Sequence, residues 1–206
     1  MNINYVSIGN KSNSLLKENI DKGLNYLRSY SINVFTDIPD IYPYSTIYKI
    51  INKYDNGLQN SRYVKTNLYS YTKSEFNLYL DVDTIVMNNG IKLFKEILLD
   101  GFDFVICPSN NQADNSFWHI SNTEREYTFN QIGYLSLQLQ CGVFAYRKNE
   151  IVDKFFKSWY AEWMKFEQHD QAAFVRALHN NPISYYVLGN SWNGGTIIRH
   201  DFGKLR

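Results

Sequence analysis

The chain has 206 residues, of which 44% are hydrophobic and 20% charged, a length and composition that suit one globular domain. Its net charge of +1, without a basic run or a zinc-finger spacing, argues against a protein that binds nucleic acid. Two cysteines make no disulfide framework, and the sequence has neither a signal peptide nor a long apolar run, so we expect a soluble, cytoplasmic protein without a membrane-spanning segment.

The beginning of the chain alternates between strand-like and helix-like patterns. Residues 3–8 are mostly apolar and end at Gly9, and a second strand-like run at 31–37 ends before Pro39. Between them, leucines and isoleucines recur at helical spacing over residues 15–27. A strand, a helix and a second strand in this order predict an α/β fold with a mostly parallel central sheet flanked by helices.

The rest of the chain continues this alternation. The aromatic residues between 153 and 165 follow the 3.6-residue period, which predicts packing in the core. No internal repeat or linker interrupts the sequence, so we expect one domain over residues 1–206. The patterns predict further helices at residues 62–71, 91–99, 153–165 and 168–178, and further strands within 77–86, 102–107, 135–146 and 184–188.

Two stretches lack a clear period. Residues 41–60 are rich in Tyr and Asn and predict a loop or short helices. Residues 109–131 are polar and predict a long loop. Because binding specificity commonly lies on long loops over a rigid scaffold, we expect this second stretch to contact a substrate. Trp118 either offers a stacking face there or anchors the loop to the core.

Two carboxylates one residue apart, Asp81 and Asp83, interrupt the apolar run 77–86. Burying ionised carboxylates beside a core strand costs several kcal/mol unless a cation or hydrogen-bond donors compensate. In an extended segment the two side chains point to the same face, so they can meet one hard divalent cation. The alternative is a turn after the strand, with both carboxylates hydrogen-bonded to the backbone.

Segments along most of the chain resemble, in order, those of GT-A-fold nucleotide-sugar glycosyltransferases of the family that contains glycogenin and the bacterial lipopolysaccharide galactosyltransferases. The pattern departs from the family at Val82, at Gln140, where the family has Asn, and at Arg206, where the family has Lys. The matching segments are VSIGN at 6–10, VFTD at 34–37, KTNL at 65–68, LYLDVDTIV at 78–86, LQCGVFAY at 139–146, HDQ at 169–171 and HDFG at 200–203.

The resemblance implies a role for individual residues of this chain. It implies a metal site formed by Asp81, Asp83 and His200. Next to the reacting sugar it places Asp170, Gln171 and Gln140 as catalytic residues. The residues that it assigns to the nucleotide-sugar donor are Ser7, Ile8, Gly9, Thr36, Lys65, Asp81, Val82, Asp83, Cys141, Gly142, Gly203, Lys204 and Arg206.

Simpler interpretations exist for several of these side chains. Asp170 is also a normal first-turn residue of a helix, favoured by the helix dipole. Lys65 is equally well explained as a solvated helix charge, and His200 as a packed histidine. The thiol of Cys141 suits the core as a small apolar group better than it suits a reaction.

The implied activity is transfer of a sugar from a nucleoside-diphosphate donor, with a UDP-sugar favoured, to a carbohydrate, glycoprotein or other hydroxyl acceptor. The polar stretch 109–131 is then the expected acceptor wall. Oxygen ligands suit Mn²⁺ or Mg²⁺, and one imidazole favours Mn²⁺. The family retains the anomeric configuration, and a retaining route uses Gln140 or Gln171 only to line the sugar. An inverting route needs a general base, for which Asp170 is the candidate.

Two other classes of protein share parts of this pattern. Haloacid-dehalogenase-type phosphatases also place D-x-D after an apolar strand, but near the N-terminus and with a later acidic pair. A non-catalytic module that binds nucleotide sugars without transfer would keep the same metal ligands. Diphosphate-specific stabilisation that depends on the metal would favour transfer over the phosphatase.

Overall fold

The computed structural model describes residues 1–39, 42, 44–108, 117, 119–134 and 138–201. Its centre is a seven-stranded sheet in the order β3-β2-β1-β4-β7-β6-β8. Strand β7 runs antiparallel to both of its neighbours, and the other four pairs are parallel, which confirms the expected mostly parallel sheet. The strands are β1 (Asn2–Ser7), β2 (Ser31–Thr36), β3 (Ser45–Lys49), β4 (Phe76–Leu80), β6 (Phe104–Pro108), β7 (Leu139–Arg147) and β8 (Tyr185–Val187).

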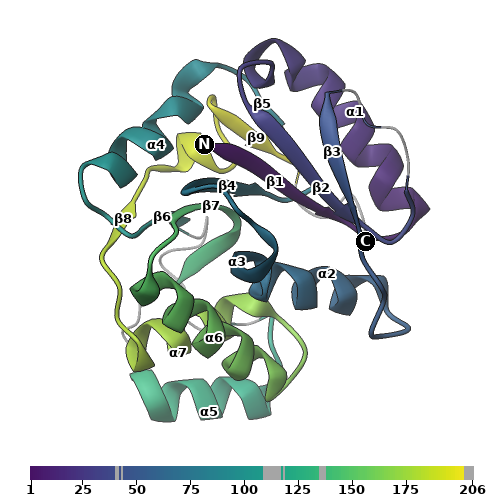
Figure 1. The fold of residues 1–206 in the computed structure, drawn as a ribbon. Coiled ribbons are helices and arrows are strands. Elements are labelled where there is room, and N and C mark those ends of the chain that lie inside the picture. Colours follow the sequence, from purple (N-terminus) through teal and green to yellow (C-terminus); the bar gives the residue numbers. More distant parts are fainter. Residues whose placement is uncertain (40–41, 43, 109–116, 118, 135–137, 202–206) are drawn as a thin grey trace.

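Helices cover both faces of this sheet (Figure 1). On one face lie α1 (Asn10–Leu27) and α4 (Lys92–Leu99), together with a small second sheet of β5 (Thr84–Val86) and β9 (Ile198–His200). On the other lie α2 (Gly57–Thr66), α3 (Leu68–Tyr71), α6 (Glu150–Met164) and α7 (Asp170–Asn180), with α5 (Asn122–Ile132) packed against α7. Two 3₁₀ turns complete the described elements, η1 (Asn89–Ile91) and η2 (Asn190–Trp192).

The central strands are buried on both faces because each contributes side chains to the hydrophobic cores on both sides of the sheet. In β4, Leu78 and Leu80 pack toward α1 and α4, whereas Tyr79 packs toward α6. Such two-sided burial produces the near-continuous apolar runs seen in the sequence. The aromatic residues of α6, including Trp159 and Trp163, are buried, which confirms their expected place in the core.

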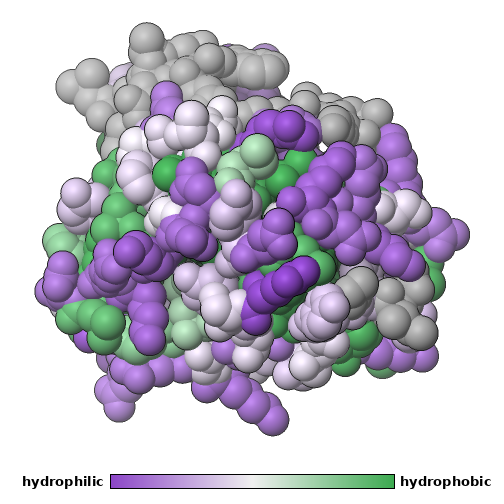
Figure 2. Space-filling model, turned by 90° about the horizontal axis from the view of Figure 1, so that it is seen from above, coloured by the Kyte–Doolittle hydropathy of each residue, from purple (hydrophilic) through white to green (hydrophobic). Residues whose placement is uncertain are grey.

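One face of the molecule is largely polar. Seen at 90° to Figure 1, it mixes hydrophilic side chains with smaller, separate hydrophobic areas (Figure 2). Among the described helices, none combines the length and the apolar character that a bilayer crossing requires. The expected single domain stays a prediction.

Two of the expected loops contain regular structure. The stretch 41–60 includes the edge strand β3, whose residues are all half-buried or exposed, so its sequence carries few apolar positions. Helix α5 occupies the second half of the stretch 109–131. It begins at an N-cap, Ser121, and buries the polar side chains of Glu124 and Thr128, so no apolar period marks it. Helix α2 begins before the expected bound, at Gly57 after the N-cap Asn56.

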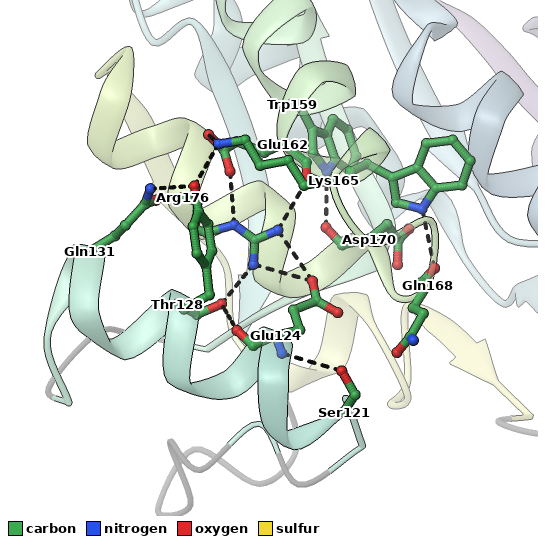
Figure 3. Close-up of polar contacts among 12 residues, drawn as sticks. Ser121, Glu124, Thr128, Gln131, Trp159, Glu162, Lys165, Gln168, Asp170 and Arg176 are labelled. Carbon is green, nitrogen blue, oxygen red and sulfur yellow. Dashed lines mark hydrogen bonds and ion pairs between the residues drawn. The ribbon is translucent and has the colours of Figure 1, made fainter.

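A buried arginine joins α5, α6 and α7 (Figure 3). The guanidinium of Arg176 in α7 is fully buried, and its Nε donates to Glu162 Oε2 of α6 at 2.9 Å. Its Nη1 and Nη2 both lie 3.2 Å from Glu124 Oε1 of α5, and Nη1 donates to Thr128 Oγ1 at 2.6 Å. The planar donor fork of arginine suits such a multiple contact. This cluster therefore fixes the position of α5 on the helix that begins at Asp170.

Removing Arg176 should destabilise the protein strongly. The variant Arg176→Ala removes the cation that pairs with buried Glu124 and leaves Glu162 only its ion pair with Lys165, so we expect the free energy of unfolding to fall by about 3–5 kcal/mol. Lys157→Ala removes an exposed ion pair with Asp153 within α6, and should change the free energy of unfolding by less than about 0.5 kcal/mol. Urea denaturation measures both, and equal effects of the two substitutions would contradict this account.

Candidate functional site

Three candidate metal ligands meet where β4 ends. Asp81 and Asp83 follow β4 directly, and His200 ends β9. Pairing of β5 with β9 places Thr84 opposite His200, and the backbone N–H of Asp201 donates to the carbonyl of Asp83 at 2.9 Å. One ligand atom from each of the three side chains lies within 4.8 Å of the others. The small second sheet is therefore what brings His200 to the two aspartates.

The two aspartates converge through a turn, and the expectation of an extended segment is wrong. Val82 and Asp83 form a turn, closed by a bond from the Thr84 N–H to the Asp81 carbonyl at 3.1 Å. The Thr84 hydroxyl donates to the same carbonyl at 2.6 Å. Both sequence alternatives were thus partly correct, because the segment is a turn and its carboxylates still share a cluster.

The imidazole of His200 lies between two oxygen atoms. Its Nε2 is 3.0 Å from Asp83 Oδ1, and its Nδ1 is 2.6 Å from the side-chain oxygen of Asn193. Strand β7 approaches from the other side, where the Gly142 carbonyl accepts from the Asp81 N–H at 2.8 Å. A Cβ added at Gly142 would lie 2.5 Å from His200 Cε1 and 2.8 Å from Asp81 Oδ2. Only glycine therefore allows the backbone to pass so close to the cluster.

The charges of this region fit a divalent cation. Two carboxylates and an imidazole form the donor set, and oxygen with one nitrogen suits Mn²⁺ or Mg²⁺. Burial raises the pKa of the Asp81 carboxyl above its ordinary value, although Lys65 opposes this rise. Asp81, Asp83, Asp170 and Lys65 sum to a formal charge of −2, since this region holds three carboxylates and one ammonium. A bound divalent cation would offset this charge.

Lys65 connects the candidate metal ligands to α7. Its ammonium is buried, 3.0 Å from Asp81 Oδ1 and 2.9 Å from Asp170 Oδ2, so the interpretation as a solvated helix charge is wrong. Burial alone would lower the pKa of Lys65, but Asp170 and Asp81 hold it well above its ordinary value. Burial would raise the pKa of Asp170, but the positive charges of Lys65 and Arg62 outweigh burial and hold this pKa at about 2. The expected contact of Lys65 with a diphosphate stays a prediction.

The three residues expected at the sugar lie next to this ion pair. Asp170 and Gln171 are the first two residues of α7, and the Gln171 amide nitrogen donates to the side-chain oxygen of Gln140 on β7. Asp170 lies in the first turn of α7, whose N-cap is His169. Cys141 follows Gln140 in β7, and burial raises the pKa of its thiol well above the ordinary value. The thiol therefore packs in the core, as expected.

The loop after β1 is built from buried hydroxyl groups. The hydroxyls of Ser7 and Thr36 donate to Asn13 Oδ1 at 2.5 and 3.2 Å, and both residues are fully buried. Gly9 has a φ of +84°, and its N–H donates to Asp37 Oδ1 at 2.9 Å. Ile8 is half-buried beside it. Ser7 and Thr36 thus hold the loop in shape, and any donor contact from them would use other atoms than these hydroxyls.

An open cavity of about 490 Å³ adjoins this loop. One of its lining residues, Asn52, donates to Asp37 Oδ2 at 2.9 Å, so the cavity and the Gly9 loop share Asp37. The cavity is lined by Lys49, Ile50, Ile51, Asn52, Lys53, Tyr63 and Tyr71.

Some expected residues lie outside the described part of the chain. They are Gly203, Lys204 and Arg206 of the donor site, and Trp118 of the expected acceptor wall. Val82 is described, and it is buried with its carbonyl accepting from the Asn19 amide at 2.8 Å.

Sequence reasoning missed two residues of the cluster. The Tyr79 hydroxyl donates to Asp81 Oδ1 at 2.6 Å, and the ring of Tyr79 lies 5.0 Å from the Lys65 ammonium. The two-residue spacing of Tyr79 and Asp81 at the end of β4 could have indicated this contact. Asn193, the partner of His200, lies seven residues away across a glycine turn, and no local pattern pointed to it.

Comparison with solved structures identifies the fold. The chain is similar to mouse xyloside xylosyltransferase 1 in its apo form, at 11% identity, a TM-score of 0.60, and coverage of 93% of this chain and 86% of that one. It is also similar to an active-site mutant of LgtC, at 12% identity, a TM-score of 0.60, and coverage of 92% and 73%. The galactosyltransferase LgtC with donor and acceptor sugar analogues gives 11% identity and a TM-score of 0.59, with coverage of 92% and 74%.

At these identities the likeness establishes the fold, which is the expected GT-A fold. No protein-family profile matches the sequence. No curated protein matches it either.

The close approach of Gly142 predicts a specific loss. In Gly142→Ala the new methyl group would displace His200 or Asp81, so we expect Mn²⁺ affinity to fall at least tenfold while the helical and strand content stays unchanged. Gly189→Ala is the matched control, because nothing lies within 4 Å of the added Cβ and its φ is −73°. Calorimetry with Mn²⁺ measures both, and equal affinities would contradict the assigned cluster.

Proposed function

We propose that this protein is a metal-dependent glycosyltransferase that moves a sugar from a nucleoside-diphosphate donor to a hydroxyl acceptor. The observation that carries the proposal is the continuity of the candidate metal ligands with neighbouring carboxylate, ammonium and amide groups. Asp83 and His200 form one end, Lys65 bridges Asp81 to Asp170, and Gln171 follows at the other end. The likeness of the fold to known glycosyltransferases supports the same assignment.

A metal ion held by the candidate ligands would stabilise the charge of the leaving diphosphate. Glycosyl transfer breaks a C–O bond while negative charge grows on the departing nucleoside diphosphate, and stabilising this charge gives the largest help. Asp81, Asp83 and His200 would hold Mn²⁺ or Mg²⁺, which when bound supplies that electrostatic stabilisation. The proposed donor is a UDP-sugar, and Lys204 and Arg206 are proposed to bind its phosphates.

The residues beyond Lys65 suit a sugar ring. Asp170 offers carboxylate oxygens, and Gln140 and Gln171 offer amide donors and acceptors, which is the chemistry that hydroxyl groups require. Lys65 pairs with both Asp81 and Asp170, so it fixes the group proposed to bind the sugar relative to the candidate metal ligands. The half-buried position of Gln140 keeps its amide within reach of solvent and ligand.

The proposed acceptor is a carbohydrate or glycoprotein, contacted by the segment 109–131. Helix α5 forms the end of this segment and is fixed on α7 by Arg176. LgtC, whose fold is similar, has been captured with donor and acceptor sugar analogues.

The ion pair of Asp170 supports retention of anomeric configuration. A general base works best when its pKa lies near the working pH. Burial would raise the pKa of Asp170, but the charges of Lys65 and Arg62 hold this pKa at about 2. Asp170 is then a sugar-positioning group, and the inverting route lacks its base. Proton NMR of the product's anomeric centre tests this, because an anomer opposite to that of the donor would contradict retention.

A haloacid-dehalogenase-type phosphatase suits the site less well. That chemistry uses a later acidic pair beside its D-x-D, whereas here the third member of the described cluster is His200. The alternative of a non-catalytic nucleotide-sugar-binding module keeps every contact described above, and product formation separates it from the transferase.

Donor binding tests the proposal directly. Calorimetry of UDP with the wild-type protein should show an affinity that rises at least tenfold when Mn²⁺ is added. In Asp83→Ala this metal-dependent gain should disappear, because the link between Asp83 and His200 is lost. The control is Asp100→Ala, an exposed carboxylate after α4, which should keep the full gain. An Asp83→Ala protein with unchanged metal-dependent affinity would overturn the proposal.

A further inference from the structure

We propose that Asn193 is a positioning residue that fixes which ring nitrogen of His200 carries the proton and so prepares Nε2 to bind the metal. The inference deepens the proposed function, on whose metal site it rests. Asn193 contacts none of the candidate metal ligands except His200 among the contacts described, and it acts through that ring alone.

The contact is buried and short. Asn193 is 1% exposed, and its side-chain oxygen lies 2.6 Å from His200 Nδ1. Its amide nitrogen has no hydrogen-bond partner within the described part of the chain. Burying a polar side chain costs free energy unless it forms hydrogen bonds. The bond between its oxygen and His200 is therefore the contact that offsets the burial of Asn193.

The backbone around Asn193 holds it in place. The turn that follows is closed by two bonds, from the N–H groups of Gly194 and Gly195 to the Ile198 carbonyl, at 2.9 and 3.0 Å. A Cβ at Gly195 would lie 2.6 Å from Ser191 Cα, so the turn is as tight as the chain allows. Trp192 Nε1 donates to the Gly90 carbonyl at 3.2 Å and ties the turn to η1. Asn193 is thus supported by backbone contacts that do not involve His200.

The chemistry follows from what a carboxamide oxygen can do. It only accepts hydrogen bonds, so Nδ1 must be the protonated nitrogen of a neutral ring. The lone pair of Nε2 then faces Asp83 Oδ1 across 3.0 Å, where two acceptors repel unless a cation lies between them. Partners of this kind on the distal nitrogen fix the tautomer and orientation of metal-binding histidines. If the amide nitrogen faced Nδ1 instead, Nε2 would carry the proton and could not bind a metal.

Two substitutions separate this role from a structural one. Asn193→Asp keeps an acceptor toward Nδ1, so we expect Mn²⁺ affinity to stay within about threefold of wild type. Asn193→Leu keeps the volume and removes the acceptor, and we expect Mn²⁺ affinity to fall about 10- to 100-fold. Asn193→Ala provides the same loss should the leucine variant fail to fold. Trp192→Phe is the control, because it weakens the same turn without touching His200, and its affinity should equal that of wild type.

A second readout follows the proton itself. The chain has four histidines, so ¹⁵N labelling with a His200→Gln reference identifies the His200 ring in a long-range ¹H–¹⁵N spectrum. With Mg²⁺ added, we expect a downfield, slowly exchanging Nδ1 proton in the wild type and in Asn193→Asp. The signal should be lost in Asn193→Leu.

Two results would overturn the inference. One is a wild-type ring whose Nε2 carries the proton, and the other is an Asn193→Leu protein that keeps full Mn²⁺ affinity. A wild type that binds neither ion would refute the proposed function. In that case the Nδ1 signal of the metal-free protein alone decides the role of Asn193.

Discussion

The site depends on the compensation of negative charge at the end of β4. Asp81, Asp83 and Asp170 bring three carboxylates to the edge of a buried sheet, where Asp83 and Asp170 are buried and Asp81 is half-buried, so water offsets only part of their charge. Lys65 compensates one unit of it and does so from a buried position between two of the carboxylates. The remaining negative charge is what a divalent cation at Asp83 and His200 would offset, and burial raises the pKa of the neighbouring Asp81 carboxyl.

The rest of the fold keeps these charges in place. The β5–β9 pair carries His200 to the aspartates, and the glycine at 142 lets β7 pass beside them. On the opposite face, Arg176 fixes α5 and α6 around α7, whose first residue is Asp170. The described structure thus links both ends of the Asp81–Lys65–Asp170 chain to rigid, buried elements, which is what a preorganised site requires.

The sequence predicted the parts of the fold that repeat a simple period. The buried strands and the aromatic face of α6 are recognisable from their apolar residues, and their positions were correct to within a few residues. Strand β3 and helix α5 were missed because an edge strand is half exposed and because α5 buries Glu124 and Thr128 in place of apolar side chains. Both elements derive their stability from tertiary contacts that a local pattern does not carry.

The candidate site divides in the same way. Asp81 and Asp83 were recognisable because two charges interrupt an apolar run, and His200 because it stands in a matching terminal segment. The bridging position of Lys65 and the contacts of Tyr79 and Asn193 depend on distances across the fold. Crystals grown with Mn²⁺ and measured at a wavelength where manganese scatters anomalously test the central claim most directly. The account predicts an anomalous peak within bonding distance of Asp83 and of Nε2 of His200. A crystal grown at saturating Mn²⁺ whose peak lies elsewhere, or that shows no peak, would contradict it.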